Sequence, residues 1–402
     1  MSGKDLFVDV AIVGAGLVGL SAAVALHQSG YSVALIDCKN PANNNLATDE
    51  VCETWDARIY AISPKNAYWL QSLGVWQDIN TTRIGEMHAM EIFADDNPLP
   101  LTLSADDANA DNLGYIVESS ALMQALLKRI KSLSIKTFFD SPCDSVIATP
   151  SKATLRLANK ITVESSLLLA ADGNQSWVRR QLNFHIQKKS YNQTAIVANF
   201  KVEKSHKNIA RQWFSQDAEG SNCILAWLPL PDSTISIVWS VSTKSADLLL
   251  ELTDIEFTNK VMSAGGAALG DLKLISPILG FPLSLQKTIT AVQDCVVLVG
   301  DAAHQVHPMA GQGVNLGFRD VLDLVSVVKE KNKYQALNDA SLLKHYTRLR
   351  KADLLNMLLL TDGLFQLFGS RTKGIKKVRN WGLSATKLQM IKEILVSNAI
   401  SH

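Results

Sequence analysis

The stretch Val296-Val-Leu-Val-Gly-Asp301-Ala-Ala-His304-Gln-Val-His307-Pro308-Met-Ala-Gly311-Gln-Gly313-Val-Asn315-Leu-Gly317-Phe-Arg-Asp320 decides the fold of this chain. It predicts a short buried strand, a tight turn ending in a carboxylate, a Gly/Pro loop and a helix, because apolar residues recur at helical spacing from Val314 to Val328. Gly311 and Gly313 let the backbone approach a bound group closely. The free N–H groups of the following helix's first turn favour an anion there.

A second glycine-rich turn lies near the N-terminus, in Val10-Ala-Ile-Val-Gly14-Ala-Gly16-Leu-Val-Gly19. The pattern around it predicts a strand over residues 7–13, a helix over 17–28 and a second strand over 31–36, which together form a βαβ unit.

Asp37 follows this turn at about the spacing of the acidic residue in dinucleotide-binding units. In that interpretation Gly14 makes the turn, Gly16 admits a pyrophosphate, Gly19 allows close packing, and Asp37 accepts hydrogen bonds from a ribose. The alternative is that these glycines serve packing alone. We expect the two glycine turns to hold opposite ends of one large cofactor.

Composition excludes several classes of protein. A net charge of +1 argues against a nucleic-acid partner, and 47% hydrophobic residues are those of a globular protein. The five cysteines are scattered and lack C-x-x-C spacing, so they predict neither a disulfide framework nor a metal site. Glycines interrupt the apolar N-terminal stretch, which lacks a basic leader. We therefore expect a cytoplasmic protein.

Two further segments carry candidate site residues. Residues 167–180 predict a strand that enters an Asp172-Gly173 turn and then a helix, with Ser176 and Arg179 one turn apart. A plain strand-to-helix connection with a capping Asp or Ser is the alternative. Arg58, which leads into a short apolar segment, has either a cofactor or substrate role or a role at the strand end only.

Residues 184–283 are β-rich, with alternating patterns such as Thr234-Ile-Ser-Ile-Val-Trp-Ser-Val241. We expect an antiparallel sheet inserted between the halves of a nucleotide-binding domain. Among its aromatic residues, one or two are expected to line a pocket and the rest to form core; the candidates are Trp213, Phe214, Trp227 and Trp239.

The predicted fold class is α/β, with a Rossmann-like FAD-binding domain, an inserted antiparallel-sheet substrate domain and a C-terminal helical region. The predicted boundaries are 1–85, 105–183 and 284–335 for the FAD-binding domain, 86–104 and 184–283 for the β-rich domain, and 336–402 for the C-terminal helices. The tail from Arg371 is basic, with interleaved apolar residues. It is either a solvated terminal helix or a helix that docks on a membrane surface or a partner.

Three motifs in this order resemble the p-hydroxybenzoate hydroxylase-like, FAD-dependent aromatic hydroxylases: the glycine triplet, Ala171-Asp172-Gly173, and Gly300-Asp301-Ala-Ala-His304. More narrowly, residues 307–320 look like the signature of the ubiquinone-biosynthesis hydroxylases, and residues 56–63 and 227–230 are also similar to that family. Met309 stands where the signature has a branched aliphatic residue, and Asp37 stands where many members have Glu.

The resemblance implies a flavin whose adenosine end lies at Gly14, Gly16, Gly19 and Asp37, and whose ribityl chain or pyrophosphate meets Asp301. The implied cofactor-binding residues further include Arg58, Asp172, Arg179, Gly300, Pro308, Gly311, Gln312, Gly313 and Asn315. No catalytic base is indicated; His304 and His307 are the nearest titratable candidates, and a structural role is favoured for both.

The implied reaction is a monooxygenase cycle on a lipophilic, polyprenylated phenol. NAD(P)H reduces FAD, O₂ adds to give a C4a-hydroperoxyflavin, and one oxygen atom passes to the ring. The enzyme is then expected to visit the inner membrane or a quinone-synthesis complex through its basic tail. The alternatives are a hydroxylase of a soluble aromatic substrate and a non-catalytic flavin-fold subunit. A nicotinamide dehydrogenase is least favoured, since it leaves residues 300–320 unexplained.

Overall fold

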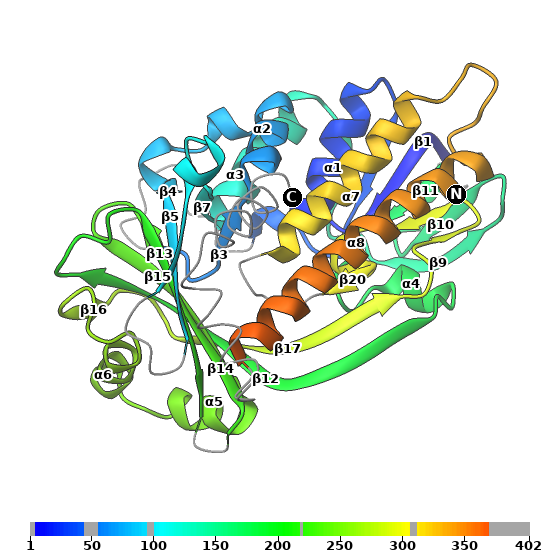
Figure 1. Cartoon of the computed structure of the whole chain (residues 1–402). Coiled ribbons are helices and arrows are strands. Elements are labelled where there is room, and N and C mark those ends of the chain that lie inside the picture. The colour runs from blue at the N-terminus through cyan, green and yellow to red at the C-terminus, as the bar shows by residue number, and fades with distance from the viewer. Residues whose placement is uncertain (1–4, 44–54, 95–99, 218–219, 306–311, 370–402) are drawn as a thin grey trace.

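The computed structural model describes residues 5–43, 55–94, 100–217, 220–305 and 312–369. Figure 1 shows a mixed α/β molecule in which helices cover one sheet and a second, larger sheet extends from it. Long strands run between the two parts. The α/β class predicted from the sequence is confirmed.

The first sheet, eight-stranded in the described residues, has a parallel centre in the order β19-β11-β1-β2-β8. Its strands are β1 (Asp5–Val13), β2 (Val33–Ile36), β8 (Lys136–Phe138), β9 (Cys143–Ala148), β10 (Ala153–Leu157), β11 (Thr162–Ala170), β18 (Val292–Gln293) and β19 (Val296–Leu298).

The central strands of this sheet are apolar on both faces because both faces are covered. On β1, Val10 and Ile12 pack into the helical layer, whereas Ala11 and Val13 pack into a second cluster with β9 and β10 residues. The helices of this part are α1 (Leu17–Gln28), α2 (Pro64–Ser72), α3 (Ser119–Ser132), α4 (Trp177–Gln181) and α7 (Gln312–Lys329).

The second sheet, nine-stranded in the described residues, has the order β20-β17-β12-β15-β14-β13-β5-β6, with β16 on β12. Its pairs are antiparallel except for β13 with β5, which are parallel. The strands are β5 (Ala89–Ala94), β6 (Leu101–Ser104), β12 (Ile186–Val202), β13 (Ile209–Gln216), β14 (Asn222–Leu230), β15 (Thr234–Ser242), β16 (Leu272–Leu274), β17 (Leu279–Thr288) and β20 (His304–Gln305).

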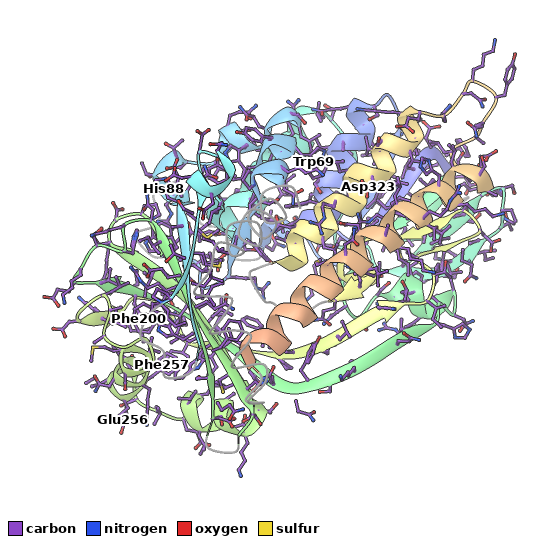
Figure 2. All side chains as sticks on the ribbon, viewed as in Figure 1. Trp69, His88, Phe200, Glu256, Phe257 and Asp323 are labelled. Atoms are coloured by element: carbon purple, nitrogen blue, oxygen red, sulfur yellow. The ribbon has the colours of Figure 1, made fainter. Side chains whose placement is uncertain are left out.

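Helices α5 (Thr243–Leu250) and α6 (Asp254–Ala264) belong to the second sheet's part of the molecule, and the core beside them joins helix and strand residues. Phe200 of β12 and Phe257 of α6 meet there with ring centroids 6.4 Å apart (Figure 2). A small third sheet, β3 (Ile59–Ile62), β7 (Gly114–Glu118) and β4 (Gly85–Met87), lies where the chain passes between the two large sheets.

Helix α8 (Ala340–Gly369) runs alongside α7, as Figure 1 shows. Leu343 and Tyr346 of α8 are buried in the same core cluster as α1 and α7, so this helix shares the core of the first sheet's helical layer. The division into domains at the boundaries given above stays a prediction. Among the described residues, no helix combines the length and the apolar character needed to cross a bilayer.

Candidate active site

Four predicted motifs follow four neighbouring parallel strands. Gly14 follows β1, and Asp37 follows β2. Asp172 comes shortly after β11, and Gly300 comes shortly after β19. The strand ends are in register: Val13 pairs with both Ile36 and Ala170, and Ala170 pairs with Leu298. Segments far apart in sequence therefore meet at the carboxyl edge of one sheet, where open α/β folds bind ligands.

The first glycine turn leaves space at one position only. Gly14 has φ +107°, and a Cβ there would lie 2.3 Å from the Ala171 carbonyl oxygen. A Cβ on Gly19 would lie 1.9 Å from the Gly14 carbonyl oxygen. At Gly16, in contrast, a Cβ would meet no atom within 4 Å. Gly14 and Gly19 therefore serve close packing, and the open space beside Gly16 is free for a ligand.

The start of α1 can bind an anion. Its N-cap is Gly16, no side chain caps the first turn, and that turn carries no acidic residue. Asp37 fixes the approach to this turn, since its Oδ2 accepts from the Ala15 N–H at 2.6 Å and its Oδ1 from the Lys39 N–H at 2.9 Å. Carboxylate oxygens have further lone pairs, so Asp37 can also accept from a ribose hydroxyl.

Asp172 and Arg179 form hydrogen bonds with backbone groups of the segments around the site. Asp172 Oδ2 accepts from the N–H groups of Trp177 and Val178, which begin α4. Arg179 donates to the carbonyl oxygens of Ala302 at 2.8 Å and Asn174 at 2.6 Å. Burial raises the pKa of Asp172 and lowers the pKa of Arg179. The contacts support positioning roles for both residues, with Arg179 tying the Asp-Gly turn to the loop that contains Asp301.

Asp320 of α7 is the centre of a buried charged network. It accepts hydrogen bonds from the Gly300 N–H at 2.7 Å and from Arg350 Nε at 2.6 Å, and its Oδ2 lies 2.7 Å from His304 Nε2. Burial alone would raise the pKa of Asp320, but interactions with His304 and Arg350 outweigh it and lower that pKa. The contact of His304 with Asp320 supports a structural role for this histidine. Asp320 and Arg350 had no predicted role.

Asp301 lies in the wall of the cavity described below. Desolvation raises the pKa of its carboxyl group, as does the nearby Asp320, while His304 opposes them. Val18 of α1 packs close to both Gly300 and Gly317 of α7. A Cβ added to Gly317 would lie 2.6 Å from Val18 Cγ2 and 3.3 Å from the Gly300 Cα. The first turn of α1 and the second turn of α7 therefore flank the Gly300 turn.

The start of α7 is anchored through Asn315. Its Nδ2 donates to the Ala61 carbonyl oxygen at 2.7 Å, and its Oδ1 accepts from the Ser63 N–H at 3.0 Å and from Asn66 Nδ2 at 2.8 Å. The side chain of Asn315 thus joins α7 to the end of β3 and the start of α2. The sequence gives no sign of the role of Asn66, because its partner Asn315 lies 249 positions away in the chain.

A cavity of about 580 Å³ lies between the start of α7 and the second sheet. Its volume is within the range of small-molecule sites. One wall contains Asp301, Gly313 and Asn315, and Arg58 lies in the wall with its guanidinium 5.3 Å from the centre of the Phe281 ring. The floor is mainly apolar and comes from β12, β14 and β15; it includes Ala195, Val197, Ile224, Ala226, Leu228 and Val238.

Three of the four aromatic residues proposed to line a pocket lie away from the described cavity. Trp213, Trp227 and Trp239 point to the opposite face of the second sheet and pack in the core with α6. Phe214 is buried and pairs with Ile224 of the floor, so it lies on the cavity face of the sheet, although it is not among the described lining residues. The predicted alternation of the strands was correct, but the three tryptophans lie on the helix-covered face.

Three predicted site residues, His307, Pro308 and Gly311, lie outside the described residues, as does the tail from Arg371. Gln312 begins α7. At Gly313 a Cβ would meet no atom within 4 Å, so the start of α7 also leaves space next to the cavity.

The profile of the FAD binding domain family matches residues 7–357. The chain is 30% identical to the human "Ubiquinone biosynthesis monooxygenase COQ6, mitochondrial", over 98% of this chain and 93% of the relative. It is 32% identical to "Ubiquinone hydroxylase UbiL" of Rhodospirillum rubrum, over 98% of this chain and 90% of the relative. The chain belongs to this family of FAD-dependent monooxygenases. The predicted family, enzyme class and FAD cofactor are confirmed.

Solved structures agree on the fold. The p-nitrophenol 4-monooxygenase PnpA of Pseudomonas putida has a TM-score of 0.74 at 14% identity, over 99% of both chains. Klebsiella pneumoniae HpxO, complexed with FAD and uric acid, has a TM-score of 0.72 at 17% identity, over 98% of this chain and 97% of the other.

The residues present suit FAD. The uncapped first turn of α1 and the open space at Gly16 match a pyrophosphate, because backbone N–H groups at a helix start favour anions. Asp37, beside that turn, has acceptor capacity for a ribose. The alternative that the glycines serve packing alone applies to Gly14 and Gly19, but not to Gly16.

We expect Gly16→Ala to fold normally and to bind FAD at least about tenfold more weakly, because its methyl group enters the space that a pyrophosphate would fill. Gly19→Ala is the contrasting variant: its Cβ would collide with the Gly14 carbonyl, so it should lower the free energy of unfolding by about 1–3 kcal/mol. Thermal unfolding of the flavin-free proteins and fluorescence titration with FAD measure both effects. A Gly16→Ala protein that binds FAD like the wild type would contradict the assignment.

We expect Asp320→Asn to lower the free energy of unfolding at neutral pH by about 3–5 kcal/mol, because it leaves buried Arg350 without its closest carboxylate. The pKa of Asp320 is lower folded than unfolded, so its stabilisation is complete above the unfolded pKa of about 3.9 and is lost as pH falls through the folded pKa. Urea unfolding between neutral and acidic pH should show a flatter pH dependence for the variant.

Asp323→Asn is the matched control for that measurement. Asp323 lies on the same helix and contacts the same Arg350, but its side chain is 28% exposed. It should cost less than about 1 kcal/mol. Equal losses of unfolding free energy in the two variants would contradict the prediction that Asp320 is the main carboxylate partner of Arg350.

Proposed function

We propose that this enzyme hydroxylates the ring of a polyprenylated phenol in ubiquinone biosynthesis, with NAD(P)H as the electron donor and O₂ as the oxygen source. The observation that carries the proposal is an apolar cavity between the Asp301 loop and the second sheet, in a chain related along nearly its full length to proteins named for ubiquinone biosynthesis.

We assign the two ends of the flavin to the two glycine turns. Gly14, Gly16, Gly19 and Asp37 would hold the adenosine and pyrophosphate end, and the loop with Gly300 and Asp301 would meet the middle of the cofactor. Gln312, Gly313 and Asn315 would lie beside the ring. FAD, when bound, supplies the redox chemistry that activates O₂; the chain binds and orients the reactants.

The start of α7 contributes to the electrostatics of the reaction. A helix N-terminus carries about half a positive charge, which stabilises negative charge nearby by about 0.3–2 kcal/mol depending on burial. Asn315 fixes that helix start to β3 and α2, so the charge is held in place before the substrate binds. The apolar floor excludes water from the reacting ring, which limits wasteful decay of activated oxygen.

Arg58 and Asp301 are the charged side chains among the described lining residues. The backbone around Arg58 is fixed, since Asp56 Oδ1 accepts from its N–H at 2.8 Å and its carbonyl accepts from the Ser119 N–H at 2.9 Å. The residue itself is exposed. We infer that Arg58 acts at the cavity mouth, on the cofactor or the incoming substrate.

A polyprenyl tail has a large affinity for lipid, about 0.8 kcal/mol for each buried CH₂, so the enzyme must meet its substrate at a membrane or in a complex that carries it. The basic tail from Arg371, which interleaves Lys and Arg with Trp381, Leu383 and Met390, is our candidate for that contact.

In a strain that lacks the gene for this chain, we expect ubiquinone to fall and a prenylated phenol with one ring hydroxyl fewer to accumulate. Mass spectrometry of extracted quinones identifies that intermediate, and re-expression of the wild-type chain should remove it. Re-expression of Gly16→Ala, at equal protein level, should restore less ubiquinone. An unchanged quinone profile in the deletion strain, with soluble phenols stimulating NAD(P)H oxidation instead, would favour a hydroxylase of soluble aromatic substrates.

Removal of residues 371–402 should reduce association with membranes or a quinone-synthesis complex while FAD stays bound. Fractionation of cell extracts together with flavin absorbance of the purified protein measures both properties. A matched variant in which Lys373, Lys376, Lys377 and Arg379 are replaced by Gln tests whether the positive charge is responsible. Unchanged fractionation of the truncated chain would contradict the role given to the tail.

A further inference from the structure

Two polar side chains on the cavity floor have no hydrogen bond to another described residue. Gln212 of β13 is 8% exposed, Ser240 of β15 is 3% exposed, and both line the cavity. Two other glutamines of the same sheet have partners: Gln193 Nε2 donates to the Asn222 carbonyl oxygen at 2.6 Å, and Gln216 Nε2 donates to Asn222 Oδ1 at 3.2 Å.

Strand register places Gln212 and Ser240 on the same floor. Gln212 pairs with Ala226, which pairs with Val238, and all three line the cavity. Ser240 pairs with Ile224 on the neighbouring strand, one two-residue step further along the sheet. With strands about 4.8 Å apart and about 3.4 Å per residue, the two Cα atoms are separated by roughly 12 Å, so the side chains can reach opposite edges of one aromatic ring.

The amide of Gln212 lies among apolar side chains and faces the cavity. Gln212 shares the cavity wall with Met90, Ile224, Ala226 and Val238. Its amide atoms are not among the fully buried polar atoms without a partner in the described residues, so they are accessible from the cavity. A polar group in such a wall is normally bonded to ordered water or to a ligand. A leucine or methionine would fill the same space but could form no such bond, so the amide is available to a ligand in the cavity.

The cationic side chain among the described lining residues lies far from Gln212, which favours an uncharged ligand there. Arg58, the cationic side chain among the described lining residues, contacts Phe281 of β17, and β13 lies four strands from β17 in the sheet order. That is roughly 19 Å at normal strand spacing. An aromatic carboxylate at Gln212 would lack a cationic partner there. A neutral phenol suits the amide, because each has both a donor and an acceptor.

We propose that Gln212, together with Ser240, is the specificity-determining group of this enzyme: it binds the oxygen substituent of a neutral phenol ring and so decides which ring carbon faces the flavin side of the cavity. This inference rests on the proposed function and narrows its substrate to rings without a carboxylate. Gln212 donates to or accepts from the substrate oxygen, and Ser240 Oγ binds a second substituent at the other edge. The apolar residues between them pack against the ring face.

Gln212→Met removes the amide and keeps the length of the side chain, and Ser240→Ala removes the hydroxyl. The matched control is Gln187→Met, an exposed position on β12. The probes are 2-geranylphenol and geranylbenzene, which differ only in the hydroxyl group. Their dissociation constants follow from the change in flavin absorbance of the FAD-loaded protein, and hydroxylated product and H₂O₂ are measured per NAD(P)H consumed.

The wild type and Gln187→Met should bind 2-geranylphenol at least tenfold more tightly than geranylbenzene. Gln212→Met should bind the two alike, with more H₂O₂ per NAD(P)H and a change in the ring position hydroxylated. FAD content and the thermal unfolding midpoint should stay at the wild-type values. Ser240→Ala should change the same quantities in the same direction by less, and it provides the test if Gln212→Met does not fold.

A retained preference for the phenol and unchanged coupling in both Gln212→Met and Ser240→Ala would overturn the inference, while wild-type turnover of the prenylated phenol would leave the proposed function in place. A wild-type enzyme that hydroxylates no prenylated phenol would overturn the proposed function itself. Tighter wild-type binding of 4-hydroxybenzoate than of 2-geranylphenol would contradict the neutral-ring assignment directly.

Discussion

The register of the parallel strands is the constraint on which the rest of the site depends. Val13, Ile36, Ala170 and Leu298 are cross-strand neighbours, so the segments that follow them must meet at one edge. A slip of one residue in any pair would turn every side chain of that strand to the opposite face and bury the wrong set. Both faces of these strands are packed, which fixes the register firmly.

From that edge the site is extended by contacts between distant segments. Asp320 connects α7 with the Gly300 turn and, through Arg350, with α8, so the last described helix helps to shape the loop that carries Asp301. The second sheet reaches the same loop through β20, which pairs with β17. The cavity is therefore lined by segments that are distant in the sequence and are held together by these contacts. Such a site can be preorganised before substrate arrives, which supports efficient catalysis.

Sequence reasoning was most successful where the signal is local. The predicted helix at residues 17–28 matches α1, and the turn that follows β1 has its glycines where close packing requires them. The charged network could not be foreseen, since Asp320 and Arg350 lie on different helices and an ion pair leaves no periodic trace. The alternation of β15 predicts two faces of the sheet, but it does not indicate which face α6 covers. The expectation that a tryptophan lines the cavity was therefore wrong, because all three tryptophans pack on the α6 side. Gln212 had no local signal, because only the fold shows that its neighbours leave its amide unpaired.

The measurement that tests the central claim most directly is a structure of the FAD-loaded protein. We predict one flavin that spans both turns, with pyrophosphate oxygens within about 3.2 Å of backbone N–H groups at the start of α1 and the ring system beside Gly313 and Asp301, over the cavity floor. A flavin bound elsewhere, or one whose ring points away from that cavity, would contradict it.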